Sequence, residues 1–199
     1  MTKTGSEKRI LRLAGALVCL VFAMLLPMAV HAAGKKAAIS VDPVNHKENC
    51  SAVLYNNVSG LPTSDANDIT ATEDGFIWIA SYSGLIRYDG NTFERLDSRT
   101  GLASVTDLLA DSKGRLWIAT NDSGLVMMED GELRYWRERN GLGSDKVDAL
   151  AEDRDGIIYV GSRGIMMISE NLKVTPVKDP LVEKAYIEQM KVGEDGLIY

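Results

Sequence analysis

The chain has 199 residues and a formal charge of −6 at pH 7, from 22 basic and 28 acidic side chains, with only two histidines. An acidic chain without a basic stripe is a poor nucleic-acid binder, because neutralised phosphates supply most of the non-specific affinity. His31 and His46 both precede Cys50, so the rest of the chain holds neither a Ser-His-Asp arrangement nor a His-rich metal site.

Residues 1–32 have the layout of an export signal. Residues 1–12 carry four basic side chains and one acid, and an almost uncharged apolar run over 13–30 follows. The run ends in Val30-His31-Ala32, which resembles a cleavage site, so we expect a signal helix that is removed after Ala32. The stretch 11–30 is also long enough to span a bilayer, which leaves an uncleaved signal anchor as the alternative. Without residues 1–32 the formal charge is −9, and this acidic remainder is expected to be exported.

Residues 33–52 have no hydrophobic period and few large apolar side chains, so we expect a linker between the signal and the first strand. Cys50 is the only cysteine that follows the signal. An internal disulfide is therefore impossible after cleavage, and the fold depends on its apolar core.

From residue 60 onward the chain repeats itself. A turn glycine recurs at Gly75, Gly114, Gly156 and Gly196. An aromatic residue follows three places after each glycine, at Trp78, Trp117, Tyr159 and Tyr199. The aromatics thus recur with a period of roughly 40 residues, which is typical of β-propeller blades.

Each unit is expected to form four antiparallel strands. Short runs rich in Ile, Val, Trp and Tyr lie between glycine-containing turns, and helical spacing never persists beyond about two turns. The turn glycines mark one hairpin in each unit. Asp89-Gly90 and Asp130-Gly131 mark a second hairpin, and Gly84, Gly124 and Gly164 mark a third. This predicts an all-β chain, a partial propeller of three four-stranded blades plus the start of a fourth.

We expect Trp78 and Trp117 to pack between neighbouring blades, with Tyr159 in the same place in the third. The runs Phe76-Ile77-Trp78-Ile79-Ala80 and Arg115-Leu116-Trp117-Ile118-Ala119 are apolar almost throughout. A strand that is buried on both faces requires such a run. Large aromatics dominate β cores, which favours packing over a role in stacking on a ligand.

The predicted blades cover residues 53–100, 101–140 and 141–182, and a truncated fourth covers 183–199. The third departs from the pattern, because Ser169-Glu170-Asn171 replaces the Asp-Gly hairpin. Propellers close a ring with about four to eight blades. We therefore expect an N-terminal fragment of a longer protein, which associates through its open edge.

The repeated acids are expected to form turns. An acid precedes a glycine at Asp74, Asp89, Asp130, Asp155 and Asp195. Asp favours such turns, whereas an active-site pair of carboxylates would appear once and not in every blade. We therefore predict no catalytic residue, no metal site and no cofactor.

One stretch, Arg134-Tyr135-Trp136-Arg137, interleaves cations with aromatics and does not follow the repeat. Such a cluster can line a site for a sugar or a carboxylate, but the solvated face of an outer blade strand gives the same pattern. We favour the solvated strand and keep Arg134, Tyr135, Trp136 and Arg137 as candidate ligand-binding residues.

The repeat resembles that of the two-component regulator propeller family. In the first unit, the family's pattern appears as Asp74-Gly75-Phe76-Ile77-Trp78-Ile79-Ala80-Ser81, Gly84-Leu85-Ile86, Tyr88-Asp89-Gly90 and Phe93. A second copy is Gly114-Arg115-Leu116-Trp117-Ile118-Ala119-Thr120 with Gly124-Leu125. The resemblance covers about residues 60–199, although Tyr159 replaces the tryptophan in the third unit.

This resemblance implies the extracytoplasmic sensor propeller of a bacterial receptor, on the periplasmic or cell-surface face of the inner membrane. It implies an immunoglobulin-like segment, a transmembrane helix and a histidine kinase or diguanylate cyclase beyond Tyr199. The chain itself would then be no enzyme, and would meet the membrane only through its N-terminal segment or that later helix. The implied partners are a small ligand, carbohydrate for some members, and a second receptor in a homodimer.

The residues leave two other functions open. An exported propeller enzyme such as a glycosidase or sialidase is one, and a plain adhesion scaffold is the other. Sialidase repeats carry Ser-x-Asp-x-Gly-x-Thr-Trp, whereas Thr72-Glu73-Asp74-Gly75 places the acid directly before the glycine. An enzyme would need a non-repeated acid pair, and a receptor would need an apolar run of about 20 residues followed by a signalling domain.

Overall fold

The computed structural model describes residues 38–39, 52–96, 100 and 102–199. The predicted signal helix, or anchor, over 1–32 lies outside these residues. Two short 3-10 turns are described in full within them, η1 (Asn57–Ser59) and η3 (Glu138–Asn140). No helix in these ranges is long and apolar enough to cross a bilayer.

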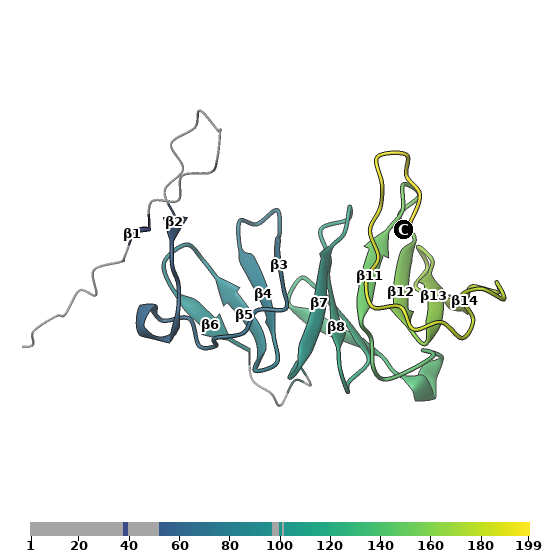
Figure 1. Cartoon of the computed structure of the whole chain (residues 1–199), viewed down its shortest axis with the longest axis horizontal. Coiled ribbons are helices and arrows are strands. Elements are labelled where there is room, and N and C mark those ends of the chain that lie inside the picture. Colours follow the sequence, from purple (N-terminus) through teal and green to yellow (C-terminus); the bar gives the residue numbers. More distant parts are fainter. Residues whose placement is uncertain (1–37, 40–51, 97–99, 101) are drawn as a thin grey trace, which may run out of the picture. The chain divides into compact units, whose positions relative to one another are not determined.

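Three four-stranded antiparallel sheets follow one another along the chain (Figure 1). The first consists of β3 (Asp68–Ala71), β4 (Ile77–Ser81), β5 (Gly84–Tyr88) and β6 (Phe93–Arg95). The second consists of β7 (Val105–Ala110), β8 (Leu116–Thr120), β9 (Leu125–Glu129) and β10 (Glu132–Trp136). The third consists of β11 (Ala149–Glu152), β12 (Ile158–Ser162), β13 (Gly164–Ile168) and β14 (Val174–Pro176). Consecutive strands are neighbours in every sheet, which confirms the prediction of an all-β chain with four antiparallel strands per unit.

The second strand of the middle sheet shows why its sequence is apolar. All five residues of β8 are buried, and Trp117 has no exposed surface. A strand covered on both faces has no solvent side, so apolar residues follow one another without alternation.

Glycines make the tight connections between the second and third strands of the sheets. Gly84, Gly124 and Gly164 all have positive φ, at 125°, 79° and 85°. At Gly124 a Cβ atom would lie 2.2 Å from the carbonyl oxygen of Trp136. Only glycine combines this φ with so close an approach of two backbone segments.

The first strands of the three sheets are adjacent. The middle one, β7, contacts both β3 and β11, and the three lie in chain order in Figure 1. The order of the sheets in space therefore follows their order in the sequence, and the middle sheet packs one face against the first sheet and the other against the third.

Two segments outside these sheets are also described. In the region predicted as a linker, β1 (Ala38–Ile39) pairs antiparallel with β2 (Ala52–Val53). Residues 183–199 form two isolated bridges, Arg163 with Tyr186 and Val192 with Ile198. Backbone bonds from Gly164 to Ala185 and from Ile187 to Ser162, both 2.8 Å, attach this segment to the third sheet. It forms no sheet of its own, so a fourth blade stays a prediction.

Candidate functional site

Two apolar clusters join the three sheets. The first lies between the first and second sheets, and Trp78, Ala80 and Leu85 pack there against residues of the second. Those residues are Leu108, Leu116, Ile118 and Val126. Trp78 is 6% exposed, so most of its ring serves the contact between two sheets.

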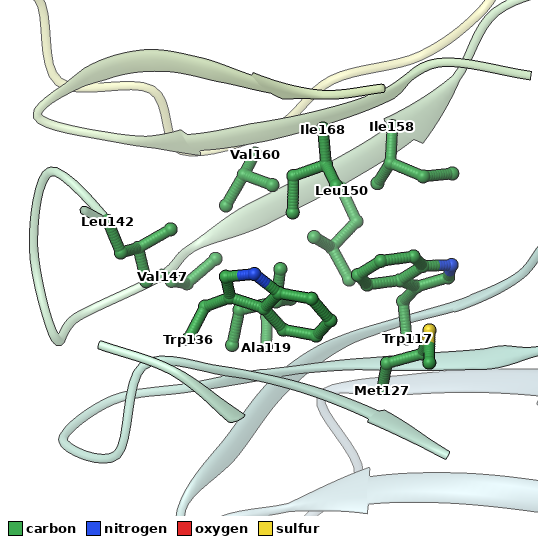
Figure 2. Packing of buried hydrophobic residues seen from close by; sticks show 11 residues of the cluster. Trp117, Ala119, Met127, Trp136, Leu142, Val147, Leu150, Ile158, Val160 and Ile168 are labelled. Carbon is green, nitrogen blue, oxygen red and sulfur yellow. The ribbon is translucent and has the colours of Figure 1, made fainter. Parts of the chain in front are cut away.

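The second cluster repeats this arrangement between the second and third sheets (Figure 2). Trp117 and Ala119 of β8 face Val147, Leu150 and Val160 of the third unit. Figure 2 shows Trp117 and Trp136 side by side below the third sheet, and their ring centroids are 5.4 Å apart. Both indoles therefore fill the gap between sheets.

In the third unit, Tyr159 occupies the position that Trp78 and Trp117 hold in the first two. It is half-buried, and burial, followed by a hydrogen bond to Asp153, raises the pKa of its hydroxyl. Next to it, Gly161 takes the place of Ala80 and Ala119, and a Cβ there would lie 2.6 Å from Cγ2 of Ile187. Residues from the segment 183–199 thus cover this face of the third sheet.

A buried ion pair supports the turn before β8. Nε of Arg115 donates to Oδ2 of Asp111 at 2.6 Å, and the two side chains are 7% and 0% exposed. Backbone N–H groups of Lys113 and Arg115 donate to Oδ1 at 3.0 and 2.9 Å. Burial alone would raise the pKa of Asp111, but hydrogen bonds from Trp117 and Arg115, together with the Arg115 charge, outweigh it and hold this pKa below its usual value. This buried carboxylate therefore organises a turn.

Two of the acids that precede glycines, Asp89 and Asp195, accept hydrogen bonds within their turns. Asp89 accepts hydrogen bonds from the backbone N–H groups of Asn91 and Thr92 at 2.8 and 2.6 Å. The bond from Thr92 is the largest cause of a lowered pKa at Asp89. Asp195 accepts from the backbone N–H of Leu197 at 3.0 Å. These contacts support turn formation as the role of the repeated acids.

The four candidate ligand-binding residues lie at the outer edge of the second sheet, but their side chains have different surroundings. Trp136 is 7% exposed and belongs to the cluster with the third sheet. Tyr135 packs on the opposite face, against the cluster with the first sheet, and its hydroxyl donates to the carbonyl oxygen of Thr100 at 2.6 Å. Arg134 is exposed and Arg137 half-buried. A ligand at this edge would meet the two arginines, and their role in binding stays a prediction.

Two hollows open on the first two sheets. One, of about 400 Å³, lies where the turns of the two sheets meet, and Thr72, Glu73, Asp74, Trp78 and Asp130 are among its lining residues. The other, of about 450 Å³, lies on the face of the first sheet and is lined mainly by apolar side chains, Ile69, Ile77, Tyr88 and Phe93 among them. No group of three or more potential metal ligands occurs in the part of the chain that the structure describes.

Sequence reasoning missed the buried Asp111 and the half-buried Asp68 and Asp107. Asp111 does not precede a glycine, so the pattern of acids before glycines does not include it. It could have been found from its position six places before Trp117, which corresponds to that of Thr72 before Trp78 in the first unit. Asp68 and Asp107, on the first strands of two sheets, have the same spacing as these two tryptophans. They therefore hold equivalent places in the repeat, and a comparison of the units position by position would have found the pair.

Three comparisons with known proteins add to this geometry. The sequence pattern of the two-component regulator propeller family matches residues 101–122 and 141–164, which contain β7 with β8 and β11 with β12. No curated protein matches the chain.

Solved structures share the fold. The extracellular domain of BT3049 from B. thetaiotaomicron, described as a hybrid two-component system, gives a TM-score of 0.64 at 20% identity, over 74% of this chain and 22% of that one. The extracellular domain of BT4673 from the same organism, described likewise, gives 0.58 at 18% identity, over 75% and 22%. Virginiamycin B lyase from Staphylococcus aureus gives 0.52 at 16% identity, over 70% and 50%.

These likenesses establish the fold and leave the activity open. At identities of 20% and below, one fold serves both extracellular domains and a lyase, as is usual for widely used folds. The chain spans about a fifth of the length of the two extracellular domains that it matches, 22% in each case. The matched segments 101–122 and 141–164 are thus two repeats of the two-component regulator propeller family, within an all-β fold of propeller-like sheets.

Proposed function

We propose that the chain is the extracytoplasmic sensing segment of a bacterial transmembrane signalling receptor. The observation that carries this proposal is the pair of two-component regulator propeller repeats at 101–122 and 141–164. The shared fold of extracellular domains described as hybrid two-component systems supports it. In a receptor of this kind a ligand acts by binding one arrangement of the receptor more tightly than another.

The location outside the cytoplasm is supported by the sequence of residues 1–32. Four basic side chains, an apolar run over 13–30 and a small-residue site follow one another as in an export signal. A fusion of the full chain to alkaline phosphatase, which is active only after export, tests this. We expect activity from the fusion and none from a matched fusion without residues 1–32, while activity from both or from neither would contradict export.

The absence of catalysis in this chain is part of the proposal. Two acids at turns accept from backbone N–H groups, Asp89 from Thr92 at 2.6 Å and Asp111 from Arg115 at 2.9 Å. A carboxylate held by several donors at a turn is poorly placed to activate water, because its lone pairs are already directed to fixed partners.

The ligand proposed is a carbohydrate fragment, and the exposed Arg134 and half-buried Arg137 at the edge of the second sheet are its candidate contacts. Binding is tested by titrating the ¹⁵N-labelled chain with a panel of neutral and acidic oligosaccharides. We expect saturable shifts in residues near Arg134 and Arg137, with at least a tenfold weaker affinity, about 1.4 kcal/mol, in the Arg134→Ala variant. Arg139→Ala is the matched control, because Arg139 is an exposed neighbour outside the cluster, and it should bind normally.

The same samples discriminate the alternatives. Chromatography of the oligosaccharides after incubation should show them intact if the chain senses them, and cleaved if it is a glycosidase. Absence of binding across the panel would overturn the carbohydrate proposal while leaving the export test unaffected.

A further inference from the structure

The first strands of the three sheets are joined by side-chain hydrogen bonds that recur with the repeat. Nδ2 of Asn67, the residue before β3, donates to the carbonyl oxygen of Val105 at 2.7 Å. One unit later, Oγ1 of Thr106 donates to the carbonyl oxygen of Val147 at 2.6 Å. Each sheet therefore reaches the next through a polar side chain near the start of its first strand.

The following residue makes a second bond in the opposite direction. Oδ2 of Asp68 accepts from the backbone N–H of Leu108 at 3.0 Å, and Oδ2 of Asp107 accepts from the backbone N–H of Leu150 at 2.7 Å. The third unit has Ala149 at this position, opposite Gly161 as Asp68 is opposite Ala80. The two carboxyl groups thus connect all three sheets, and the series ends at β11.

The two carboxyl groups compete for one donor. The N–H of Leu108 that donates to Asp68 also donates to Oδ1 of Asp107, again at 3.0 Å. Oxygen atoms of the two carboxyl groups therefore both lie 3.0 Å from one nitrogen. Two carboxylates in such a position repel each other when both are ionised, because one N–H cannot neutralise two charges.

The surrounding strands bring no cation to Asp107. From β3 it faces Asp68, from β11 it faces the N–H of Leu150, and β4 and β8 carry no ionisable side chain. Glu152 of β11 accepts from Ser112 at 2.8 Å, and Asp148 forms its ion pair with Lys146 at 2.6 Å. Burial, with the charge of Asp68 and its hydrogen bond added to it, raises the pKa of Asp107 to about 7, although the N–H of Leu150 acts in the other direction.

We propose that Asp68 and Asp107 form a pH-sensitive joint, which holds the first strands of the sheets together while the pair carries a proton and loosens when that proton is lost. Protonated Asp107 donates to Asp68 and still accepts from Leu150. After deprotonation, two negative charges face each other across the contact between β3 and β7. An extracytoplasmic segment is exposed to the pH of its surroundings, so such a joint would couple sheet packing to that pH.

The direction of the pH effect follows from the raised pKa. A carboxyl group whose pKa is higher in the folded than in the unfolded chain stabilises the fold fully below its unfolded pKa of about 3.9, and this stabilisation is lost as the pH rises through the folded value. We therefore expect the joint to tighten in mildly acidic solution and to loosen on passing pH 7.

Urea unfolding of the full chain between pH 5 and 8 tests the joint. Its unfolding equilibrium constant should rise with pH, by up to about tenfold per pH unit between pH 5 and 7. The Asp107→Asn variant, which cannot ionise, should lose this slope and unfold less readily than the wild type at pH 8. Asp148→Asn, which removes a carboxylate beside the same strands, is the control and should keep the wild-type slope.

Two NMR measurements on the unsubstituted chain make the test independent of how the variant folds. They are the carboxyl carbon chemical shift of Asp107 and the hydrogen exchange of the Leu108 and Leu150 amides. We expect Asp107 to titrate near 7 and both amides to lose protection above that pH. A carboxyl carbon that titrates near 4, or an Asp107→Asn slope equal to that of the wild type, would overturn the proposal.

Discussion

The indole Nε1–H of Trp117 donates a 2.7 Å hydrogen bond to Oδ2 of Asp111, which precedes it in the same hairpin. Trp78 makes the corresponding bond to Oγ1 of Thr72 in the first sheet, at 3.0 Å. In both sheets the bond spans the hairpin between the first and second strands. It ties the aromatic ring that packs between two sheets to the turn that precedes it, so turn geometry and inter-sheet packing depend on each other.

The Asp111→Ala variant is expected to be far less stable than the Thr72→Ala variant. Removal of Asp111 leaves the Arg115 guanidinium buried without a partner, which typically costs about 3–5 kcal/mol. Removal of the Thr72 hydroxyl breaks the hydrogen bond from Trp78 and an exposed one to the Asp74 carboxylate, each worth about 1 kcal/mol. Urea unfolding of both variants at pH 7 measures the difference, and equal losses would show that the Arg115 pair adds nothing.

Lowering the pH should weaken the contribution of Asp111 to stability, whereas it should strengthen that of Asp107. The pKa of Asp111 is lowered in the fold, so its contribution is present above the unfolded pKa of about 3.9 and is lost as the pH falls through the lower folded value. Below pH 4 the free energy of unfolding should therefore fall less steeply in Asp111→Asn than in the wild type. The exposed turn residue Asp122 supplies the control, since Asp122→Asn should reproduce the wild-type slope.

The repeat made the strands and hairpins predictable. A glycine three places before each aromatic defines the turn into the second strand, and Gly84, Gly124 and Gly164 mark the next turn. These positions need backbone conformations that few residues adopt, so the sequence preserves them. The expected strands and their antiparallel order follow directly from them.

Contacts between units were harder to predict, because they depend on which face of a strand meets which neighbour. Tyr135 and Trp136 are adjacent in the sequence but pack on opposite faces of the second sheet, as alternation along a strand requires. The cluster Arg134–Arg137 therefore looked like one site although its aromatics belong to two cores. The joint between Asp68 and Asp107 was missed because the two residues meet only when the sheets are placed side by side.

Replacement of Gly124 by alanine should separate steric conflict from backbone strain. Gly124 and Gly114 have nearly the same φ, 79° and 78°, and alanine in the left-handed region costs about 1–2 kcal/mol at either position. A Cβ at Gly114 meets no atom within 4 Å, whereas at Gly124 it lies 2.2 Å from the Trp136 carbonyl oxygen. We expect Gly124→Ala to lose about 1–3 kcal/mol more than Gly114→Ala in thermal or urea unfolding, and similar losses would contradict this close approach.

The apolar face of the first sheet should make the chain associate. Ile69, Leu108 and Leu150 hold the same position in their sheets, each opposite the third residue of the second strand. Leu108 and Leu150 are 6% and 5% exposed between sheets, but Ile69 is 63% exposed, beside the hollow of about 450 Å³ that includes Ile77 and Phe93. Another sheet of this repeat fits such a face, and a second copy of the chain supplies one in solution.

Light scattering after size exclusion, over a range of concentrations, should show that Ile69→Asp weakens association at least tenfold, which corresponds to about 1.4 kcal/mol. The matched control is Tyr82→Asp, because Tyr82 is also 63% exposed but lies in the turn between β4 and β5. Both substitutions should change the stability of the folded chain by less than about 0.5 kcal/mol, as is usual for surface positions. If Tyr82→Asp reduces association as much as Ile69→Asp does, added charge and not the face of the first sheet is responsible.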